Sequence, residues 1–398
     1  MKNTEWIERG EQVFANTYTR FPAAILRGEG CRLWDANGKE YLDFLAGIAV
    51  CALGHCHPAI TAAIRSQAND LVHVSNLFYT KPQIELAELL VQNSFADRIF
   101  LANSGAEANE AAIKLARIHS TPGKFEVISL LGSFHGRTLA TVAATGQPRF
   151  HQGFEPMPAG FVHAEFGDIA AIEALIGPQT CAILCEPLQG ESGVRPLDTD
   201  YLQQIRTLCD RHQLLLIFDE VQTGLGRTGT LFAHEQLGVT PDIMTLAKAL
   251  GNGLPISAML TRKEIAASFT PGTHASTFGG NPVAAAAATE VLHTLLAPGF
   301  LESVQEKGAY FSAQLEQLTE NFPRWAAAVR GRGLLLGLVL TEEGIGRGSE
   351  IVELMFAKGM IINFAGNRVL RFAPPLIVSK NEIDVLIQEL SLVLAELT

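Results

Sequence analysis

Two charged residues in this sequence follow short apolar runs and have the chemistry to act covalently. Asp219 comes directly after residues 214–218, and Lys248 comes one alanine after residues 243–246. A carboxylate at the end of a buried strand is costly to ionise without a cationic partner, and a desolvated lysine amine is suited to Schiff-base chemistry. If both runs are parallel strands, the two side chains leave one sheet edge and face one crevice. Taken singly, Asp219 would cap a turn and Lys248 would extend into solvent.

The start of a predicted helix provides a place for a phosphate. Residues 98–102 predict a strand, and residues 105–119 predict the helix that follows it. Ser104 and Glu107 have the spacing of a capping box, and a small residue such as Gly105 leaves backbone N–H groups open to an anion. An ordinary capped helix explains the same pattern equally well.

Three other motifs are less specific. Residues 134–138 (Phe-His-Gly-Arg-Thr) follow the predicted strand 125–130, and their aromatic ring and guanidinium are suited to a planar ring and a carboxylate. Residues 224–229 match G-x-G-x-x-G, but they do not follow a strand directly and open no helix, so we predict a loop. A nicotinamide-dependent dehydrogenase is the alternative that this motif leaves open. Residues 55–57 (His-Cys-His) are too close together for a tetrahedral site, so we predict a turn and no metal.

The elements that must position these residues alternate between strand and helix. Such alternation favours an α/β fold with a mostly parallel sheet covered on both faces, and ligands of such sheets lie at the carboxyl ends of the strands. The predicted strands are residues 98–102, 125–130, 161–164, 181–185, 214–218 and 243–246, and the predicted helices are residues 105–119, 169–176 and 201–212.

The two ends of the chain predict a second, smaller α+β domain. Asn37-Gly38 between apolar runs predicts a β-hairpin, and the pattern changes to long helices after residue 281. We expect an N-terminal segment, residues 1–57, that joins the small domain, a large domain over residues 58–281, and the rest of the small domain over residues 282–398. The other predicted elements are helices 58–71, 82–92, 282–296, 301–318, 350–358 and 382–397 and strands 333–340 and 369–372.

The composition argues against several classes of protein. Hydrophobic residues make up 47% of the 398 residues and charged residues 18%, which is unlike a disordered chain. The formal net charge of -11 argues against nucleic acid or an anionic membrane as a partner. No apolar run is long enough to cross a bilayer, and the N-terminus lacks the apolar core of a secretory signal. The six cysteines lie scattered in apolar contexts, as expected of reduced thiols in the cytoplasm.

Together these motifs resemble the class III pyridoxal-phosphate-dependent aminotransferases over residues 18–375, nearly the whole chain. The resemblance implies a fold-type I transferase that binds pyridoxal 5'-phosphate and acts as a homodimer with shared active sites. The segments that carry it are 103–110 (Asn-Ser-Gly-Ala-Glu-Ala-Asn-Glu), 134–138, 186–191 (Glu-Pro-Leu-Gln-Gly-Glu), 219–224 (Asp-Glu-Val-Gln-Thr-Gly), 246–251 (Leu-Ala-Lys-Ala-Leu-Gly), 276–282 (Ser-Thr-Phe-Gly-Gly-Asn-Pro) and 371–375 (Arg-Phe-Ala-Pro-Pro).

The resemblance also implies roles for individual residues. Lys248 would bind the cofactor covalently and later move a proton, and Asp219 would keep the pyridine nitrogen protonated so that the ring accepts electrons. Arg371 would bind the α-carboxylate of glutamate, and Glu191 would pair with Arg371 when no carboxylate is present. The other implied cofactor contacts are Gly105, Ala106, Phe134, Val221, Gln222 and Thr277, with Thr277 acting across the dimer, and the other implied substrate contacts are Tyr18, Arg137 and Ser276.

Within this family, residues 41–50 and 53–58 are most similar to those of the members that act on N2-acetyl-L-ornithine. Those members convert N2-acetyl-L-ornithine and 2-oxoglutarate into N-acetyl-L-glutamate 5-semialdehyde and L-glutamate, a step of arginine biosynthesis. Cys51 stands where they commonly have asparagine, and members acting on succinylornithine, succinyl-diaminopimelate or ornithine are the alternatives. A binding protein that keeps the fold without the chemistry is a further alternative, against which the joint presence of Lys248, Asp219 and both arginines argues.

Overall fold

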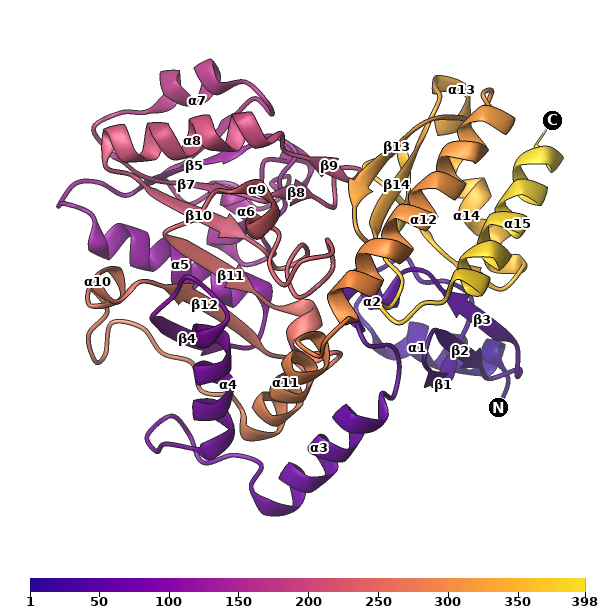
Figure 1. Cartoon of the computed structure of the whole chain (residues 1–398), viewed down its shortest axis with the longest axis horizontal. Helices are drawn as coiled ribbons and strands as arrows, with labels where there is room; N and C mark the ends of the chain where they lie inside the picture. Colours follow the sequence, from indigo (N-terminus) through magenta and orange to yellow (C-terminus); the bar gives the residue numbers. More distant parts are fainter. Residues whose placement is uncertain (398) are drawn as a thin grey trace.

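The computed structural model describes residues 1–397 and shows a larger and a smaller part side by side (Figure 1). The larger part is built on a seven-stranded sheet, in which one strand runs antiparallel to both of its neighbours and every other neighbouring pair is parallel. In spatial order the strands are β4 (Arg98–Ala102), the antiparallel β12 (Ser257–Thr261), β11 (Ile243–Leu246), β10 (Leu215–Asp219), β7 (Thr180–Cys185), β5 (Glu126–Leu130) and β6 (Phe161–Ala164). The predicted mostly parallel sheet is confirmed.

Helices cover both faces of this sheet, because successive buried side chains of its strands point to opposite faces. Ile128 and Phe218 belong to a core shared with α7 and α8, whereas Val127 and Ile217 belong to a core shared with α5. The helices of this part are α5 (Gly105–His119), α6 (Leu139–Ala144), α7 (Ile169–Leu175), α8 (Thr199–His212), α9 (His234–Leu237) and α10 (Lys263–Ala266). The cover on both faces that the sequence predicts is therefore present.

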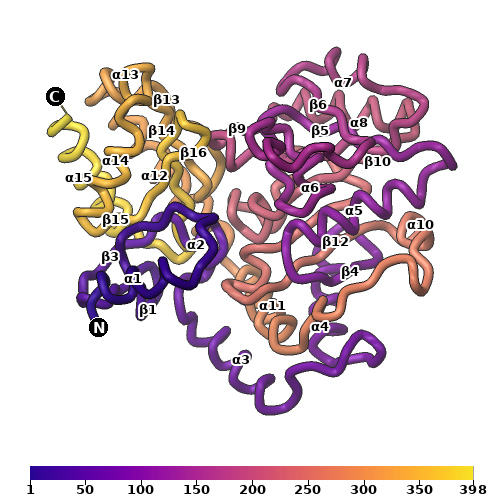
Figure 2. The backbone as a smooth tube through the Cα atoms, turned by 180° about the vertical axis from the view of Figure 1, so that it is seen from behind, coloured from indigo at the N-terminus to yellow at the C-terminus, as the bar shows by residue number. Residues whose placement is uncertain are grey.

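The smaller part joins the two ends of the chain in one sheet. Its β15 (Met360–Ile361) pairs in parallel with β3 (Glu40–Asp43), and the N-terminal and C-terminal segments lie on the same side of the molecule (Figure 2). The predicted hairpin turn at Asn37-Gly38 connects β2 (Arg32–Asp35) to β3. The remaining strands here are β1 (Ile25–Glu29), and β13 (Ala326–Arg332), β14 (Leu335–Leu340), β17 (Val369–Phe372) and β16 (Asn363–Ala365), which form a second sheet in that order. The helices are α1 (Asn3–Val13), α2 (Ala46–Ala49), α12 (Phe300–Asn321), α13 (Glu342–Ile345), α14 (Gly348–Ala357) and α15 (Lys380–Glu396).

Three helices connect the two parts along the sequence. They are α3 (Pro58–Asp70), α4 (Lys81–Gln92) and α11 (Pro282–Leu295), and α11 packs against the other two. A division that follows this packing falls between α11 and α12, so the domain bound at residue 281 stays a prediction, as does the bound at residue 57. Residue 398, the last of the predicted C-terminal segment, lies outside the described residues.

Several elements are absent from those that the sequence predicts, among them β12 and α1. β12 contains Ser257 and Ala258, which are weak strand formers, and hydrogen bonding to β4 and β11 stabilises it instead. α1 carries few apolar residues and only Asn3 of it is buried, so it lacks the apolar stripe that marks a helix in a sequence. Within residues 1–397 no single helix is long and apolar enough to span a membrane; α11 and α12 pass that test only together, and they are bent by 72° relative to each other.

Candidate active site

Several charged and polar groups face one cavity of about 400 Å³ at the carboxyl edge of the larger sheet. Four loops that follow β4, β5, β7 and β11, together with the end of β10, supply most of its wall. This is the edge at which parallel sheets bind ligands, as predicted. The wall includes Asn103, Ser104, Gly105, Ala106, Asn109, Phe134, His135, Glu186, Glu191, Asp219, Val221, Gln222, Lys248 and Ile256.

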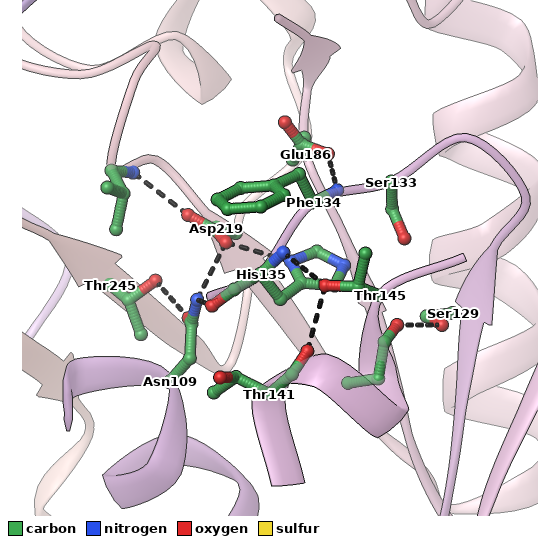
Figure 3. Close-up of polar contacts among 12 residues, drawn as sticks. Asn109, Ser129, Ser133, Phe134, His135, Thr141, Thr145, Glu186, Asp219 and Thr245 are labelled. Atoms are coloured by element: carbon green, nitrogen blue, oxygen red, sulfur yellow. Dashed lines mark hydrogen bonds and ion pairs between the residues drawn. The ribbon is translucent and has the colours of Figure 1, made fainter. Parts of the chain in front are cut away.

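Asp219 is buried at the end of β10 and is held by hydrogen-bond donors (Figure 3). Its Oδ1 accepts from the backbone N–H of Val221 at 3.0 Å, and its Oδ2 accepts from Asn109 Nδ2 at 2.8 Å. His135 Nδ1 lies 2.8 Å from the same Oδ2. Donors to a carboxylate favour its charged form, so a buried anion is stable here. Asp219 therefore presents negative charge to the cavity.

Lys248 faces the same cavity from the segment after β11. It begins the short 3₁₀ turn Lys248–Gly251 and has a left-handed φ of 43°. Such a conformation is uncommon for a residue with a side chain, and it occurs often at functional sites. Burial lowers the pKa of Lys248, and the nearby Arg371 lowers it further, while Glu191 and Asp219 oppose the shift. The site therefore favours an uncharged, nucleophilic amine more than water does.

Glu191 and Arg371 form an ion pair near Lys248. Arg371 is 1% exposed, and its Nη1 donates to Glu191 Oε1 at 2.6 Å and to the carbonyl of Gly190 at 3.2 Å. Its Nε donates to Asn363 Oδ1 at 3.1 Å. Burial alone would raise the pKa of Glu191, but Arg371 and Lys248 outweigh it and lower that pKa to about 2. The pair is thus fully ionised at neutral pH.

Glu186 is a buried carboxyl on the cavity wall that belongs to segment 186–191, but no role is predicted for it above. Its Oε1 accepts from the backbone N–H of Phe134 at 2.9 Å, and its Oε2 accepts from that of Gly190 at 3.4 Å. Burial raises the pKa of Glu186 well above its usual value, and the charge of Asp219 raises it further. The available signal was its position directly after the apolar strand β7, the same signal that singled out Asp219.

The N-terminus of α5 opens at the cavity. Ser104 caps the helix by accepting from the N–H of Glu107 at 3.2 Å, as the predicted capping box requires. Glu107 returns its carboxylate to the N–H of Asn103 at 2.9 Å, one residue earlier than in a standard box. A Cβ on Gly105 would lie 2.8 Å from a methyl carbon of Val221, so glycine is needed for this approach. An anion at this helix start is favoured by the helix dipole.

Other residues implied by the resemblance lie away from the cavity wall. Tyr18 is 71% exposed in the N-terminal segment, and Arg137 is exposed and stacks over Phe150 with its guanidinium carbon 4.1 Å from the ring centroid. Thr277 lines a separate hollow of about 830 Å³. Ser276 joins the two regions, because its Oγ lies 3.1 Å from Asn103 Nδ2.

Two of the three less specific motifs, residues 224–229 and 55–57, form a loop and a turn, as predicted. Residues 224–229 make a series of turns after β10 and open no helix. His55 Nε2 lies 2.8 Å from Asp43 Oδ2, which ties the turn at residues 55–57 to β3. Groups of three or more His, Cys, Asp or Glu side chains able to hold a metal ion are absent from the part of the chain that the structure describes.

The cavity matches the chemical groups of pyridoxal phosphate. A buried lysine suits its aldehyde, a buried carboxylate suits its ring nitrogen, and a helix N-terminus suits its phosphate. Gln222 Oε1 is buried without a hydrogen-bond partner in the described residues, which fits a ligand hydroxyl at this wall. Fold and site together define an α/β enzyme of the pyridoxal-phosphate-dependent transferase class.

A model of the family described as "Aminotransferase class-III" matches residues 13–394, and the chain belongs to this family. It is therefore an aminotransferase that uses pyridoxal phosphate, and its substrates are amino acids and 2-oxo acids. This finding removes the nicotinamide-dependent dehydrogenase that residues 224–229 left open.

Individual relatives are similar over almost their whole length. The chain is 51% identical to an acetylornithine aminotransferase from Myxococcus xanthus, covering 95% of this chain and 94% of the relative, and 50% identical to one from Thermosynechococcus vestitus, covering 97% and 96%. The structure superposes on an ornithine aminotransferase from Toxoplasma gondii with a TM-score of 0.95 at 34% identity, covering 99% and 95% of the two chains. It superposes on an N-acetylornithine aminotransferase from Stenotrophomonas maltophilia with a TM-score of 0.84 at 38% identity, covering 98% of each.

Proposed function

We propose that this enzyme transfers the terminal amino group of N2-acetyl-L-ornithine to 2-oxoglutarate, a step of arginine biosynthesis. The observation that carries the proposal is the ion pair of Arg371 with Glu191, which lines the cavity that contains Lys248 and Asp219. Glutamate has a carboxylate beside its reacting amine, whereas acetylornithine has none there. A buried arginine with a replaceable carboxylate partner serves both substrates in one site.

When bound, pyridoxal phosphate supplies an aldehyde that takes the amino group and a ring that accepts the electron pair left on the substrate carbon. Lys248, with its lowered pKa, is the residue that binds the cofactor and afterwards moves the proton at the reacting carbon. Asp219 holds a proton on the ring nitrogen. Phe134, Val221 and Gln222 line the cavity and would contact the ring, and the N–H groups of Gly105 and Ala106 would bind the phosphate.

The carboxylates of the two substrates require two cations. Arg371 binds the α-carboxylate of glutamate after Glu191 leaves it, and Glu191 returns when acetylornithine enters. Glu191 is suited to this exchange because its side chain is 30% exposed, whereas that of Arg371 is 1% exposed. Arg137 binds the acetylornithine carboxylate and the side-chain carboxylate of glutamate, with Tyr18 and Ser276 as further substrate contacts. Within residues 1–397, the Arg137 guanidinium stacks on the rings of Phe134 and Phe150 and has no ion-pair partner, so it is free to turn.

Ornithine is the alternative amino donor, since the superposition with an ornithine aminotransferase has a TM-score of 0.95. The higher sequence identity of the acetylornithine aminotransferases favours the acylated substrate. The test is a set of separate half-reactions, in which stopped-flow absorbance follows conversion of the bound cofactor by each amine. Acetylornithine, succinylornithine, succinyl-diaminopimelate and ornithine are compared at equal concentrations.

The proposal expects acetylornithine to give the highest kcat/KM of the four amines, and 2-oxoglutarate to accept the amino group and become glutamate in the second half-reaction. A preference of tenfold or more for ornithine would contradict it. Borohydride reduction followed by peptide mapping places the covalent bond, which we expect on Lys248. A Lys248→Ala protein that turns over at the wild-type rate would refute the site itself.

We also propose a cytoplasmic homodimer in which Thr277 reaches the phosphate of the neighbouring active site. Leu77, Phe78 and Tyr79 are 62% to 95% exposed, and Leu77 and Tyr79 line the same hollow as Thr277. A large exposed apolar group of this kind is typical of an interface. The six free cysteines are consistent with the reducing cytoplasm.

Mixed dimers test the shared site. A Lys248→Ala protein and a Thr277→Ala protein with weakened cofactor binding are combined, and subunit exchange is verified by mass spectrometry. One intact site per mixed dimer should restore activity to a fraction of the wild-type value. If activity does not recover after exchange, Thr277 serves its own chain.

A further inference from the structure

Asp219 is supported by a chain of buried side chains that leads away from the cavity (Figure 3). We propose that Thr245, acting through Asn109, is a positioning residue that fixes the hydrogen-bond donors on Asp219 and so strengthens its bond to a protonated ring nitrogen. This inference rests on the cofactor site proposed above. Thr245 lies on β11 next to β10, where it is opposite Asp219 in the sheet register, and its side chain is absent from the cavity wall.

Every polar group of the Asn109 amide has a partner. Its Nδ2 donates to Asp219 Oδ2 at 2.8 Å and to the backbone carbonyl of His135 at 2.8 Å. Its Oδ1 accepts from Thr245 Oγ1 at 2.8 Å. Asn109 is 1% exposed and Thr245 is fully buried, so water does not compete for these bonds. The amide therefore links α5, β10, β11 and the loop after β5.

The partners of Asn109 define one orientation of its amide. Two of them, the carboxylate of Asp219 and the carbonyl of His135, accept hydrogen bonds, and the third, the hydroxyl of Thr245, donates one. A rotated amide would point Oδ1 at two acceptors, which is unfavourable in a buried site. Thr245 adds to this preference because its hydroxyl holds Oδ1 on the far side from Asp219. Removing the hydroxyl would leave Oδ1 buried and unsatisfied, which weakens the hold on the amide.

His135 completes the set of donors. Its Nδ1 lies 2.8 Å from Asp219 Oδ2, and its Nε2 is buried and has no hydrogen-bond partner in residues 1–397. A proton on Nε2 would lack an acceptor, so the neutral ring carries its proton on Nδ1 and donates it to Asp219. With Asn109 and the N–H of Val221, Asp219 has three donors and no permanent cation. Its remaining lone pairs are free for a protonated nitrogen in the cavity.

The test measures binding to the apoprotein of two probes that differ at one atom. The probes are pyridoxal phosphate and 1-deazapyridoxal phosphate, in which a carbon replaces the ring nitrogen, and binding is followed by quenching of protein fluorescence. The variant is Thr245→Val, which keeps the shape and removes the hydroxyl, with Thr245→Ser as the conservative variant. Thr261→Val is the matched control, because Thr261 is equally buried on the adjacent strand and its Oγ1 donates to a backbone carbonyl at 2.8 Å.

We expect Thr245→Val to lose about fivefold in affinity for pyridoxal phosphate, the size of one neutral hydrogen bond, and less than twofold for the deaza probe. Thr245→Ser should restore the affinity, and Thr261→Val should leave the ratio of the two affinities at its wild-type value. Equal losses for both probes would show a merely structural role and overturn the inference. If Thr245→Val does not fold, Thr245→Ala is measured in its place with the same expectation.

Asp219→Asn separates this inference from the function on which it rests. It should remove most of the preference for pyridoxal phosphate over the deaza probe, a change of about 10- to 100-fold for a charge-assisted bond. If Asp219→Asn leaves the preference intact, the proposed role of Asp219 is wrong. If Asp219→Asn removes the preference and Thr245→Val does not change it, the role of Asp219 stands and that of Thr245 is wrong.

Discussion

Two arginines, Arg227 and Arg371, are equally buried in this enzyme, and they have different kinds of partner. Both are 1% exposed. Arg371 donates to the carboxylate of Glu191 at 2.6 Å, so its charge is balanced. Arg227 donates from Nη1 to the backbone carbonyls of Leu334 at 3.1 Å and Pro374 at 2.5 Å, and it pairs with no carboxylate among the described residues. Burial lowers the pKa of Arg227, and the charge of Asp43 opposes the shift.

The difference in partners separates a replaceable contact from a fixed one. A ligand carboxylate has the same chemistry as a side-chain carboxylate and can replace it, so under the proposed function Arg371 recognises a substrate after Glu191 leaves it. The backbone carbonyls of Leu334 and Pro374 lie just outside β14 and β17 and do not exchange, so Arg227 ties the loop at residues 224–229 to the smaller part. Under the proposed function, the same residue type thus serves binding at one position and architecture at the other. Applying one substitution to both arginines tests this comparison.

The largest effect is expected from Arg371→Met on the glutamate half-reaction. Loss of the guanidinium removes the partner of the glutamate α-carboxylate, so kcat/KM should fall about 100- to 1000-fold, corresponding to ~3–4 kcal/mol. The acetylornithine half-reaction should fall less than about tenfold, because no carboxylate lies at its reacting end. Stopped-flow absorbance of each half-reaction gives the two values separately.

The Arg371→Met variant leaves Glu191 unpaired, which could disturb the cavity by itself. The double variant Arg371→Met/Glu191→Gln removes that charge and provides the control. It should retain the loss with glutamate and recover most of any loss with acetylornithine. Equal losses for both substrates in both proteins would reduce the pair to a structural salt bridge.

Arg227→Met should lower the stability of the protein and leave its activity almost unchanged. Two buried carbonyls lose their donor, which is partly offset by removal of a buried charge, so we expect the free energy of unfolding in urea to fall by about 2 kcal/mol. Both half-reactions should stay within about twofold of wild type, because Leu334 and Pro374, the partners of Arg227, do not line the cavity, whereas Glu191, the partner of Arg371, does. A selective loss of the glutamate half-reaction in this variant would show that burial, and not the partner, decides the role of an arginine here.

The larger sheet was accessible to sequence reasoning because its strands are short apolar runs with clear ends. β4, β6 and β11 have the predicted bounds, and the end of β10 places Asp219 at the predicted edge. The same reasoning overlooked β12, since a strand with serine and alanine at its start is stabilised by neighbours that come from distant parts of the chain. Local sequence pattern thus predicts strands made of short apolar runs. It misses strands that form only because they pair with neighbouring strands.

In the site, too, some residues could be predicted from local sequence pattern and others could not. Position after an apolar strand singled out Asp219 and Lys248, but nothing local relates Glu191 to Arg371, which lie 180 residues apart in the chain. Their pairing came from the family resemblance. Asn109 and Thr245 show the limit, because a polar residue within an apolar helix or strand signals a buried hydrogen bond without indicating its partner. Distances between elements, which only the fold supplies, decide such partners.

The smallest expected effect is the loss, at acid pH, of the stability that the Glu191 carboxylate contributes through its pair with Arg371. In the folded enzyme the pKa of Glu191 is about 2, below its ordinary value of 4.5, because Arg371 and Lys248 outweigh the effect of burial. The carboxylate therefore stabilises the fold fully above pH 4.5, and this contribution is lost as the pH falls from 4.5 towards 2. Partial exposure screens the pair. We therefore expect the free energy of unfolding of wild type to exceed that of Glu191→Gln by only about 1–2 kcal/mol at neutral pH.

Urea unfolding of both proteins between pH 7 and pH 3 checks this expectation, and the difference in unfolding free energy should shrink as the pH drops below 4.5. Glu343→Gln is the matched control, because Glu343 pairs with Arg324 at the exposed surface, where solvent screening leaves little stabilisation to lose. A difference between wild type and Glu191→Gln that stays constant down to pH 3 would mean that Glu191 contributes through packing and not through its charge. In that case the ion pair would bring no stability of its own, and a substrate carboxylate would displace Glu191 more easily than the exchange proposed above requires.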